Sequence, residues 1–359
     1  MITDLRRLAN NIETMLSDAR PNSTATRFES DLEDLAAAFV DKFGLKFNKE
    51  KPNLSSPLLR WLDFRQRHVD PYPRPVVLSD KFPVANLPDE TQKGLQQLIE
   101  RFEQGADVNP YQGRGLIRKN DTSGEAKHAR TDLLFADWGI LHFHLTTKPI
   151  RPGRFFSEPD DYLAFCLVGG NGVAFLDVLP HPEKLGFANV DLFDTMARNW
   201  PEFMDKFKIR GQLLQSGAPL TTVQVSEFRE AGVGAFYNFN GTLFRSPGGG
   251  VTSASTPRRL TLACDQISAL VRTLATLVDD PVGQFRTHSA VTAVANPEFR
   301  LGIGSSGLCV VEAISKTDFL LPKAASNTEL SWMQRLNNEF APPWAAEALC
   351  PPADLQGNA

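Results

Sequence analysis

Apolar residues recur at helical spacing along the first part of the chain. Residues 1–20 carry leucine and isoleucine every three or four positions, which predicts an amphipathic helix. A second helix is predicted over about 28–43, with phenylalanine and leucine on one face and Gly44 at its end. Prolines at every second position just before residue 76 then favour an extended segment. The pattern therefore predicts an N-terminal helical region over residues 1–75.

The middle of the chain adds the alternation that is typical of strands. A helix is predicted over about 89–104, between a proline and a glycine. Alternating runs predict adjacent antiparallel strands, the last two joined by a glycine-rich turn: 138–145, 162–168 and 173–179. A helix over about 190–207 follows, and Pro201 predicts a kink or break in it. Residues 85–208 are therefore predicted to form a helix, antiparallel meander and helix.

The C-terminal part repeats this mixture of strands and helices. Asn240-Gly241 predicts a short hairpin, and the glycines at 248–250 predict a flexible connection. A helix is predicted over about 258–277, and a second hairpin over about 299–314. These elements predict a second α+β unit over residues 220–347, so the whole chain is expected to be α+β.

Composition and charge narrow the class of protein. The chain has 359 residues, of which 42% are hydrophobic, and its net charge of −4 gives no overall basic surface. The N-terminus lacks the apolar core of a signal peptide, and no run of 18 apolar residues occurs. Four separated cysteines form no CxxC motif, and no dinucleotide fingerprint or GxSxG elbow is present. We therefore expect a cytoplasmic protein with no cofactor, no disulfide and no membrane partner.

Basic residues and histidines concentrate in one stretch near the middle. From Arg114 to Arg154 there are eight lysines and arginines against four acids, and four of the six histidines fall between positions 128 and 181. His142 and His144 share one face of a predicted strand, because strand side chains alternate with a period of two. His181 follows the last strand of the same predicted sheet, where a loop residue can reach over that face.

Such a face suits the cleavage of RNA without a metal. A general base takes the proton of the ribose 2′-hydroxyl, a general acid protonates the departing 5′-oxygen, and cations stabilise the charge on phosphorus oxygens. Histidine can play either proton role near neutral pH, and arginine matches phosphate geometry. The candidate catalytic residues are His142, His144 and His181. The candidate residues for binding RNA phosphates are Arg118, Arg130, Lys148, Arg151 and Arg154.

A family resemblance points the same way. The segment YLAFCLVGGNGVAFLDVLPHPEKLG resembles the small bacterial toxins of the RelE/HigB/YoeB group, LPDETQKGLQQLIERFEQG resembles their leading helix, and DLLFADWGILHFHL the strand that follows. The resemblance implies a RelE-like domain over 85–208, endoribonuclease activity in a bacterial toxin or phage defence, and an antitoxin or other partner protein. His181 matches the functional position at the end of a strand. Leu163 and Ala164 depart from the family, which often carries an arginine just after the position of Tyr162.

Two alternatives stay open. The chain could be a non-catalytic binding or assembly protein with a degenerate RelE-like domain, which the acidic charge and the missing strand arginine favour. It could also be a metal-dependent hydrolase built on His142 and His144, with His181, Asp132 or Asp137 as a third ligand. No third ligand sits at a recognised spacing, so we predict no bound metal. A structural role for the histidine pair is a further interpretation of the same residues.

Overall fold

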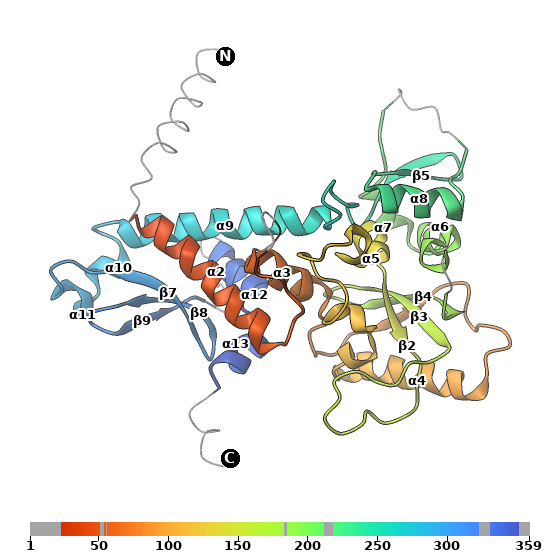
Figure 1. Cartoon of the computed structure of the whole chain (residues 1–359), viewed down its shortest axis with the longest axis horizontal. Helices are drawn as coiled ribbons and strands as arrows, with labels where there is room; N and C mark the ends of the chain where they lie inside the picture. The colour runs from red at the N-terminus through yellow and green to blue at the C-terminus, as the bar shows by residue number, and fades with distance from the viewer. Residues whose placement is uncertain are drawn as a thin grey trace. The chain divides into compact units, whose positions relative to one another are not determined.

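The computed structural model describes residues 23–50, 54, 56–182, 185–211, 218–322 and 331–351. The helix predicted over 1–20 lies outside the described residues. Contacts divide the chain into two compact units, both drawn in Figure 1. The central unit comprises Gly44–Ser55 and Leu62–Leu262, and the terminal unit comprises Met1–Phe43, Ser56–Trp61 and Ala263–Ala359. Both contain helices and strands, which confirms the α+β class.

A four-stranded sheet organises the central unit. Its strands are β1 (Val76–Leu78), β2 (Leu141–His144), β3 (Tyr162–Val168) and β4 (Val173–Pro180). The order is β1-β4-β3-β2, with β1 parallel to β4 and the other pairs antiparallel. The predicted antiparallel meander is therefore confirmed, but β1 was expected to be only an extended proline segment. The strand predicted from residue 138 begins later, because Trp138 ends helix α5 (Leu133–Trp138) and Gly139 turns with a φ of 76°.

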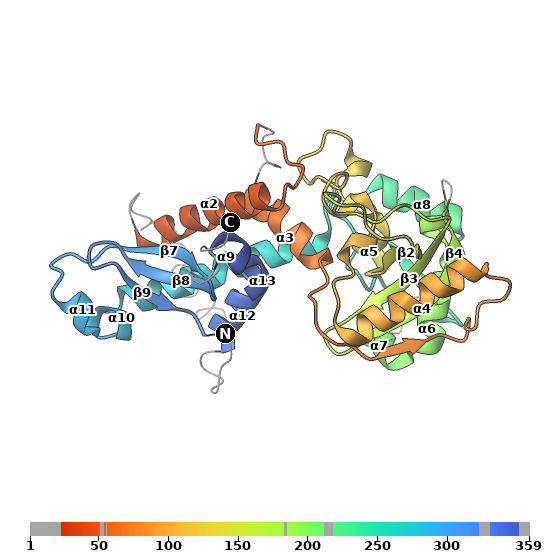
Figure 2. The same cartoon turned by 90° about the horizontal axis from the view of Figure 1, so that it is seen from below.

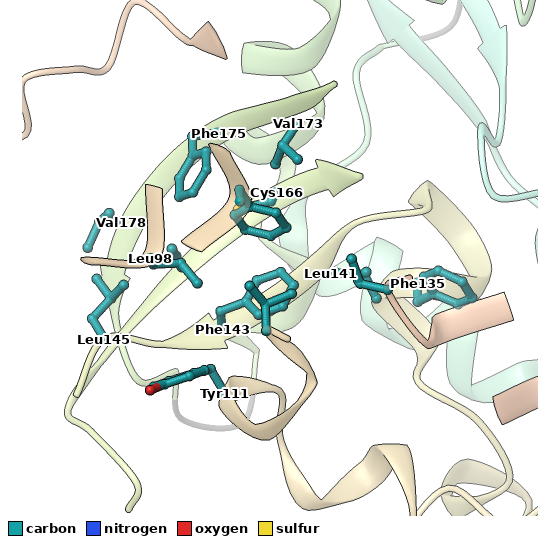
Figure 3. Packing of buried hydrophobic residues seen from close by; sticks show 14 of the residues in the cluster. Leu98, Tyr111, Phe135, Leu141, Phe143, Leu145, Cys166, Val173, Phe175 and Val178 are labelled. Atoms are coloured by element: carbon teal, nitrogen blue, oxygen red, sulfur yellow. The ribbon is translucent and has the colours of Figure 1, made fainter. Parts of the chain in front are cut away.

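Helix α4 (Asp89–Gln104) covers one face of this sheet (Figure 2). Its Phe102 ring meets Phe143 of β2 and Phe175 of β4 edge-on, at centroid distances of 5.4 and 5.9 Å. Leu98 lies among the apolar side chains that neighbouring strands direct to this side (Figure 3). These side chains are buried, so the alternate positions of each strand must face the other side of the sheet.

The opposite face of the sheet carries a second apolar cluster. It is covered by elements from the later part of the central unit: α6 (Val190–Asn199), α7 (Pro201–Asp205), α8 (Thr222–Ala231), β5 (Phe236–Phe239) and β6 (Thr242–Arg245). Phe165 of β3 packs in the same cluster as Phe193 of α6 and Tyr237 of β5. The break predicted at Pro201 is confirmed, because α6 ends at Asn199 and α7 starts at the proline.

Short 3-10 helices complete the central unit: Asn109–Tyr111, Arg114–Leu116, Lys127–Ala129 and Gly186–Ala188. The first three lie in the connection between α4 and α5. They hold this connection against the edge of the sheet, since Gln112 forms an isolated bridge with Phe143 of β2. The connection between α4 and α5 therefore packs along the edge strand β2.

The terminal unit is built from the two ends of the chain. Its elements are α2 (Thr24–Lys42), the start of α3 (Pro57–Arg67), most of α9 (Arg258–Asp279), α10 (Gln284–Thr287), α11 (Ser289–Thr292), β7 (Phe299–Gly304), β8 (Gly307–Glu312), β9 (Thr317–Leu320), α12 (Ser331–Phe340) and α13 (Pro343–Leu349). The three strands form one antiparallel sheet. Trp61 stacks on Phe39 at 4.3 Å and donates a hydrogen bond to the Phe340 carbonyl.

This division differs from the three regions that the sequence predicted. The predicted N-terminal helical region of 1–75 is split, because α2 belongs with the C-terminal strands: Asp31 accepts hydrogen bonds from Arg300 and from the Leu301 amide. The hairpin at Asn240-Gly241 forms as predicted, but it packs in the central unit and not with the region 220–347. Both differences come from pairings between residues far apart in sequence.

Helix α9 is the one described helix that is long and apolar enough to cross a membrane by length and composition. Core helices of soluble proteins meet the same criterion. Leu260, Ile267 and Val271 of α9 are buried within the protein. The cytoplasmic location stays a prediction.

Candidate functional site

A cavity of about 600 Å³ opens in the central unit on the sheet face opposite α4. The end of β2, the residues after β4, the connection at 112–120, the start of α5 and helix α8 contribute its walls. The three predicted catalytic histidines come together here. Its titratable and basic lining side chains include His142, His144, His181, Asp132, Arg114 and Lys119.

Strand geometry explains why the histidines share the cavity. His142 and His144 alternate with Phe143, which points into the core under α4. His142 pairs with Phe165 of β3 and His144 pairs with Leu163, and both partners belong to the cluster on the cavity side of the sheet. The expectation that this histidine pair shares one face is confirmed.

His142 lies beside a fixed carboxylate. Its Nδ1 is 3.6 Å from Oδ2 of Asp132. The other oxygen of Asp132 accepts the backbone N–H groups of Leu134 and Phe135 at 3.0 and 3.2 Å, so the carboxylate caps α5 and cannot swing away freely. Burial lowers the pKa of His142, and the Asp132 carboxylate partly opposes this shift. The imidazole is therefore held neutral near neutral pH, next to a negative charge that favours its protonated form.

The two ring nitrogens of His142 differ in their surroundings, because Nδ1 is buried without a hydrogen-bond partner among the described residues and Nε2 is not. A methyl group added to Gly113 would come 3.4 Å from Nε2, so this nitrogen lies near the 112–120 connection. Both Gly113 and His142 line the cavity. Nε2 is thus the nitrogen that can meet a bound group.

His144 and His181 form a second pair. Their rings stack at a centroid distance of 5.8 Å and an interplanar angle of 22°. The backbone N–H of Asp160 donates to Nδ1 of His144 at 3.2 Å, which places the proton of the neutral ring on Nε2. Burial, aided by His142 and His181, lowers the pKa of His144 to about 4. His181 is exposed to solvent at the cavity, whereas the His144 ring is a neutral hydrogen-bond donor.

A buried ion pair between Arg229 and Asp137 fixes the position of Phe187, whose ring packs against His142 and His181. Arg229 of α8 binds Asp137 through Nε at 2.7 Å and donates through Nη1 to the carbonyl of Phe187 at 2.6 Å. The Phe187 ring lies 5.0 Å from the His142 ring and 6.3 Å from the His181 ring. Asp137 also accepts hydrogen bonds from Tyr237 and Ser246. Asp137, which the sequence offered as a metal ligand, therefore anchors the ring that packs against two histidines.

The predicted phosphate-binding residues divide into two groups. Arg118, Arg151 and Arg154 line a groove of about 230 Å³, and Arg114 lines both this groove and the histidine cavity. Arg151 is paired with Glu158 at 3.0 Å. Arg130 is instead buried and donates to the carbonyls of Gly124 and Ala254, so it is inaccessible to RNA.

Lys148 lies on the exposed loop after β2 and lines neither the histidine cavity nor the arginine groove. Four cations line the histidine cavity: Arg67 and Arg229 are buried, whereas Arg114 and Lys119 are exposed. The excess of lysine and arginine between Arg114 and Arg154 predicts a basic surface here, but it does not show which of these residues line the cavity.

Among the described residues, no three side chains of histidine, cysteine, aspartate or glutamate gather in a way that could hold a metal ion. Compared with known protein families, curated proteins and solved structures, the chain matches none of them. The resemblance to RelE-like toxins therefore stays an expectation from the sequence.

Proposed function

We propose that the protein is an endoribonuclease that cleaves RNA in the histidine cavity without a metal. The observation that carries this proposal is the convergence of three histidines, one of them next to a fixed carboxylate, with Arg114 and Lys119 in one cavity. This set supplies a base, an acid and cations, which is what cleavage by the ribose 2′-hydroxyl requires.

His142 is the general base of the proposed reaction. Its burial keeps the ring neutral and able to accept a proton, and its Nε2 faces the cavity. As Nε2 takes the proton of the 2′-hydroxyl, the positive charge that forms on the ring is stabilised by Asp132 at 3.6 Å from Nδ1. Asp132 is a positioning residue, since it acts through His142.

His181 is the general acid. The 2′-oxygen attacks phosphorus, the bond to the 5′-oxygen breaks, and protonated His181 gives its proton to that oxygen. The products are a 2′,3′-cyclic phosphate and a 5′-hydroxyl. The neutral His144 ring donates from Nε2, and Arg114 and Lys119 carry the charge that grows on the phosphate oxygens.

Alanine variants test these roles. Purified protein is incubated with single-stranded RNA in excess chelator, and cleavage is followed for wild type, His142→Ala and His181→Ala. Each variant should lose about 10²- to 10⁴-fold in rate, which is the usual contribution of a positioned acid or base. His288→Ala is the matched control, because His288 is an exposed histidine of the terminal unit and its variant should cleave as wild type does.

The rival function is binding of RNA without cleavage, and one observation favours it. Leu163 is fully buried on the cavity side of β3, so this strand puts no cation beside the histidines. In that case wild-type protein leaves RNA intact, alone and with translating ribosomes. Substituting the groove residues Arg118 and Arg154 would then weaken RNA binding, while the histidine variants would bind as wild type does.

A further inference from the structure

A second, smaller cavity of about 180 Å³ lies in the central unit. Its walls come from the segment 66–74, the turn between β3 and β4, and the first turn of α9. Three arginines line it, Arg67, Arg74 and Arg259, while Asp70 is its one acidic lining residue among the residues the structure describes. The lining is therefore strongly cationic.

Two of these arginines are already occupied. Arg67 binds the Asp63 carboxylate through Nη2 at 2.5 Å. Arg74 donates to the carbonyls of Asp70 at 2.7 Å and Gly169 at 3.1 Å. The acid in the wall is occupied too, since Asp70 pairs with Arg65 at 2.9 Å.

Arg259 differs from both. Its guanidinium lies over the Phe135 ring, 3.5 Å from the ring centroid. Its Nε and Nη2 atoms are buried, and neither has a hydrogen-bond partner among the described residues. These two nitrogens form one edge of the guanidinium, and that edge is the one with which arginine binds a carboxylate or phosphate through two parallel hydrogen bonds.

Arg259 also carries a charge that lacks a direct counterion among the described residues. Burial lowers its pKa to about 10, against the weaker opposing effect of Asp63 and Asp132, so the side chain is still cationic at neutral pH. A buried cation with free donors is unfavourable unless a charged acceptor reaches it. The cavity provides the space for that acceptor.

We propose that this cavity binds a small tetrahedral oxyanion, phosphate, and that the Arg259 guanidinium turns its Nε–Nη2 edge to the anion as it binds. A phosphate matches the two parallel donors, and its double negative charge suits a wall with three guanidinium groups. The volume of about 180 Å³ fits a free anion and is too small for a whole nucleotide. The proposal does not depend on RNA cleavage, because no histidine of the larger cavity lines this one.

Titration of the full-length protein with inorganic phosphate tests the proposal. Binding is measured by calorimetry and by the shift in melting temperature, with chloride replacing phosphate at constant ionic strength. Wild type should bind saturably, and Arg259→Gln should bind about 10- to 100-fold more weakly, since a bidentate charged pair is lost. Arg258→Gln is the matched control, because Arg258 is the exposed neighbour on α9 and its variant should bind as wild type does.

Two further variants distinguish the two cavities and cover the case in which Arg259→Gln does not fold. Phosphate binding in the histidine cavity would be a separate event that depends on Arg114. If Arg114→Gln abolishes the saturable binding and Arg259→Gln does not, the anion lies in the histidine cavity and the proposal is overturned. If Arg259→Gln does not fold, Arg259→Lys keeps the charge but removes the two-pronged edge, and it should show the same weakening. No saturable effect of phosphate on wild type, unchanged binding by the Arg259 variant, or equally tight binding of acetate would each contradict the assignment.

Discussion

At the scale of single residues, the cavity depends on carboxylates and backbone groups that fix the histidine rings. Asp132 is held by the N-terminus of α5 and faces His142, while the Asp160 amide fixes the tautomer of His144. The two histidines are neutral for the same reason, burial, but only His142 has a carboxylate to stabilise its protonated form. This difference suits His142 to the role of base and His144 to the role of hydrogen-bond donor.

Asp132→Asn tests that distinction. An asparagine keeps an oxygen for the cap of α5 but removes the negative charge, so helix stability should change little. Because Asp132 raises the pKa of His142, its removal should lower that pKa further. The acid limb of the pH profile of kcat/KM should therefore move to lower pH, while the maximal rate falls roughly 10- to 100-fold. An acid limb that stays in place would show that Asp132 does not act on the base.

The lowered pKa of His144 predicts how stability depends on pH. The folded protein protonates this ring near pH 4, whereas the unfolded chain does so near 6.5. The unfolded state therefore binds more protons between these values, and stability falls as the pH drops from about 6.5 to 4. The contribution is at most about 3 kcal/mol. Denaturant unfolding at pH 7 and pH 4.5 should show a smaller loss for His144→Gln than for wild type, and equal losses would rule out protonation of His144 as the cause.

At the scale of elements, the glycine-rich segment after β6 has a different role from the one that the sequence predicts. It was expected to be a flexible connection, but Gly248 and Gly250 donate their N–H groups to the carbonyls of Asp137 and Ala136, at 2.7 and 3.0 Å. The segment therefore closes over the end of α5, next to the Asp137 ion pair. Glycine composition indicates freedom of the backbone, but it does not show which carbonyls that backbone will meet.

Gly248→Ala should disturb this closure. A Cβ at position 248 would lie 2.5 Å from the carbonyl oxygen of Ala136 and 2.6 Å from that of Phe135, so the backbone must shift. We expect a loss of about 1–3 kcal/mol in the free energy of unfolding, measured with denaturant. Gly234→Ala is the control, because no atom lies within 4 Å of its added methyl group. Equal stability of the two variants would mean that the closure contributes nothing.

At the scale of the whole molecule, the sequence predicts local elements well, but it does not predict which distant residues pair. The strands at 162–168 and 173–179 follow from alternation within a few residues, and so does the shared face of His142 and His144. The link between Arg229 and Asp137 spans 92 positions, and no local pattern indicates it. Counting charges also failed to separate the buried Arg130 from the exposed arginines, because composition carries no information on burial.

The packing of α2 with the C-terminal strand β7 gives a further prediction. Asp31 of α2 is buried and binds both Arg300 and the Leu301 amide. Asp31→Ala should therefore destabilise the terminal unit by about 1–3 kcal/mol, because it leaves the buried Leu301 amide without its acceptor and removes the ion pair of the half-exposed Arg300. Glu29→Ala removes the exposed pair with Arg272 and should change stability by less than about 1 kcal/mol. A difference between these variants too small to measure in thermal unfolding would argue against the packing of α2 on β7.

The proposed cleavage by the 2′-hydroxyl is tested most directly by the ends of the RNA products. An RNA with one 2′-deoxynucleotide at the cut position is compared with the unmodified RNA in excess chelator. We predict that the unmodified RNA yields a 2′,3′-cyclic phosphate and a 5′-hydroxyl, and that the single 2′-deoxy substitution blocks cleavage at that bond. Cutting of both RNAs alike, or cutting only after a divalent metal is added, would contradict the assignment of His142 as the base for the 2′-hydroxyl.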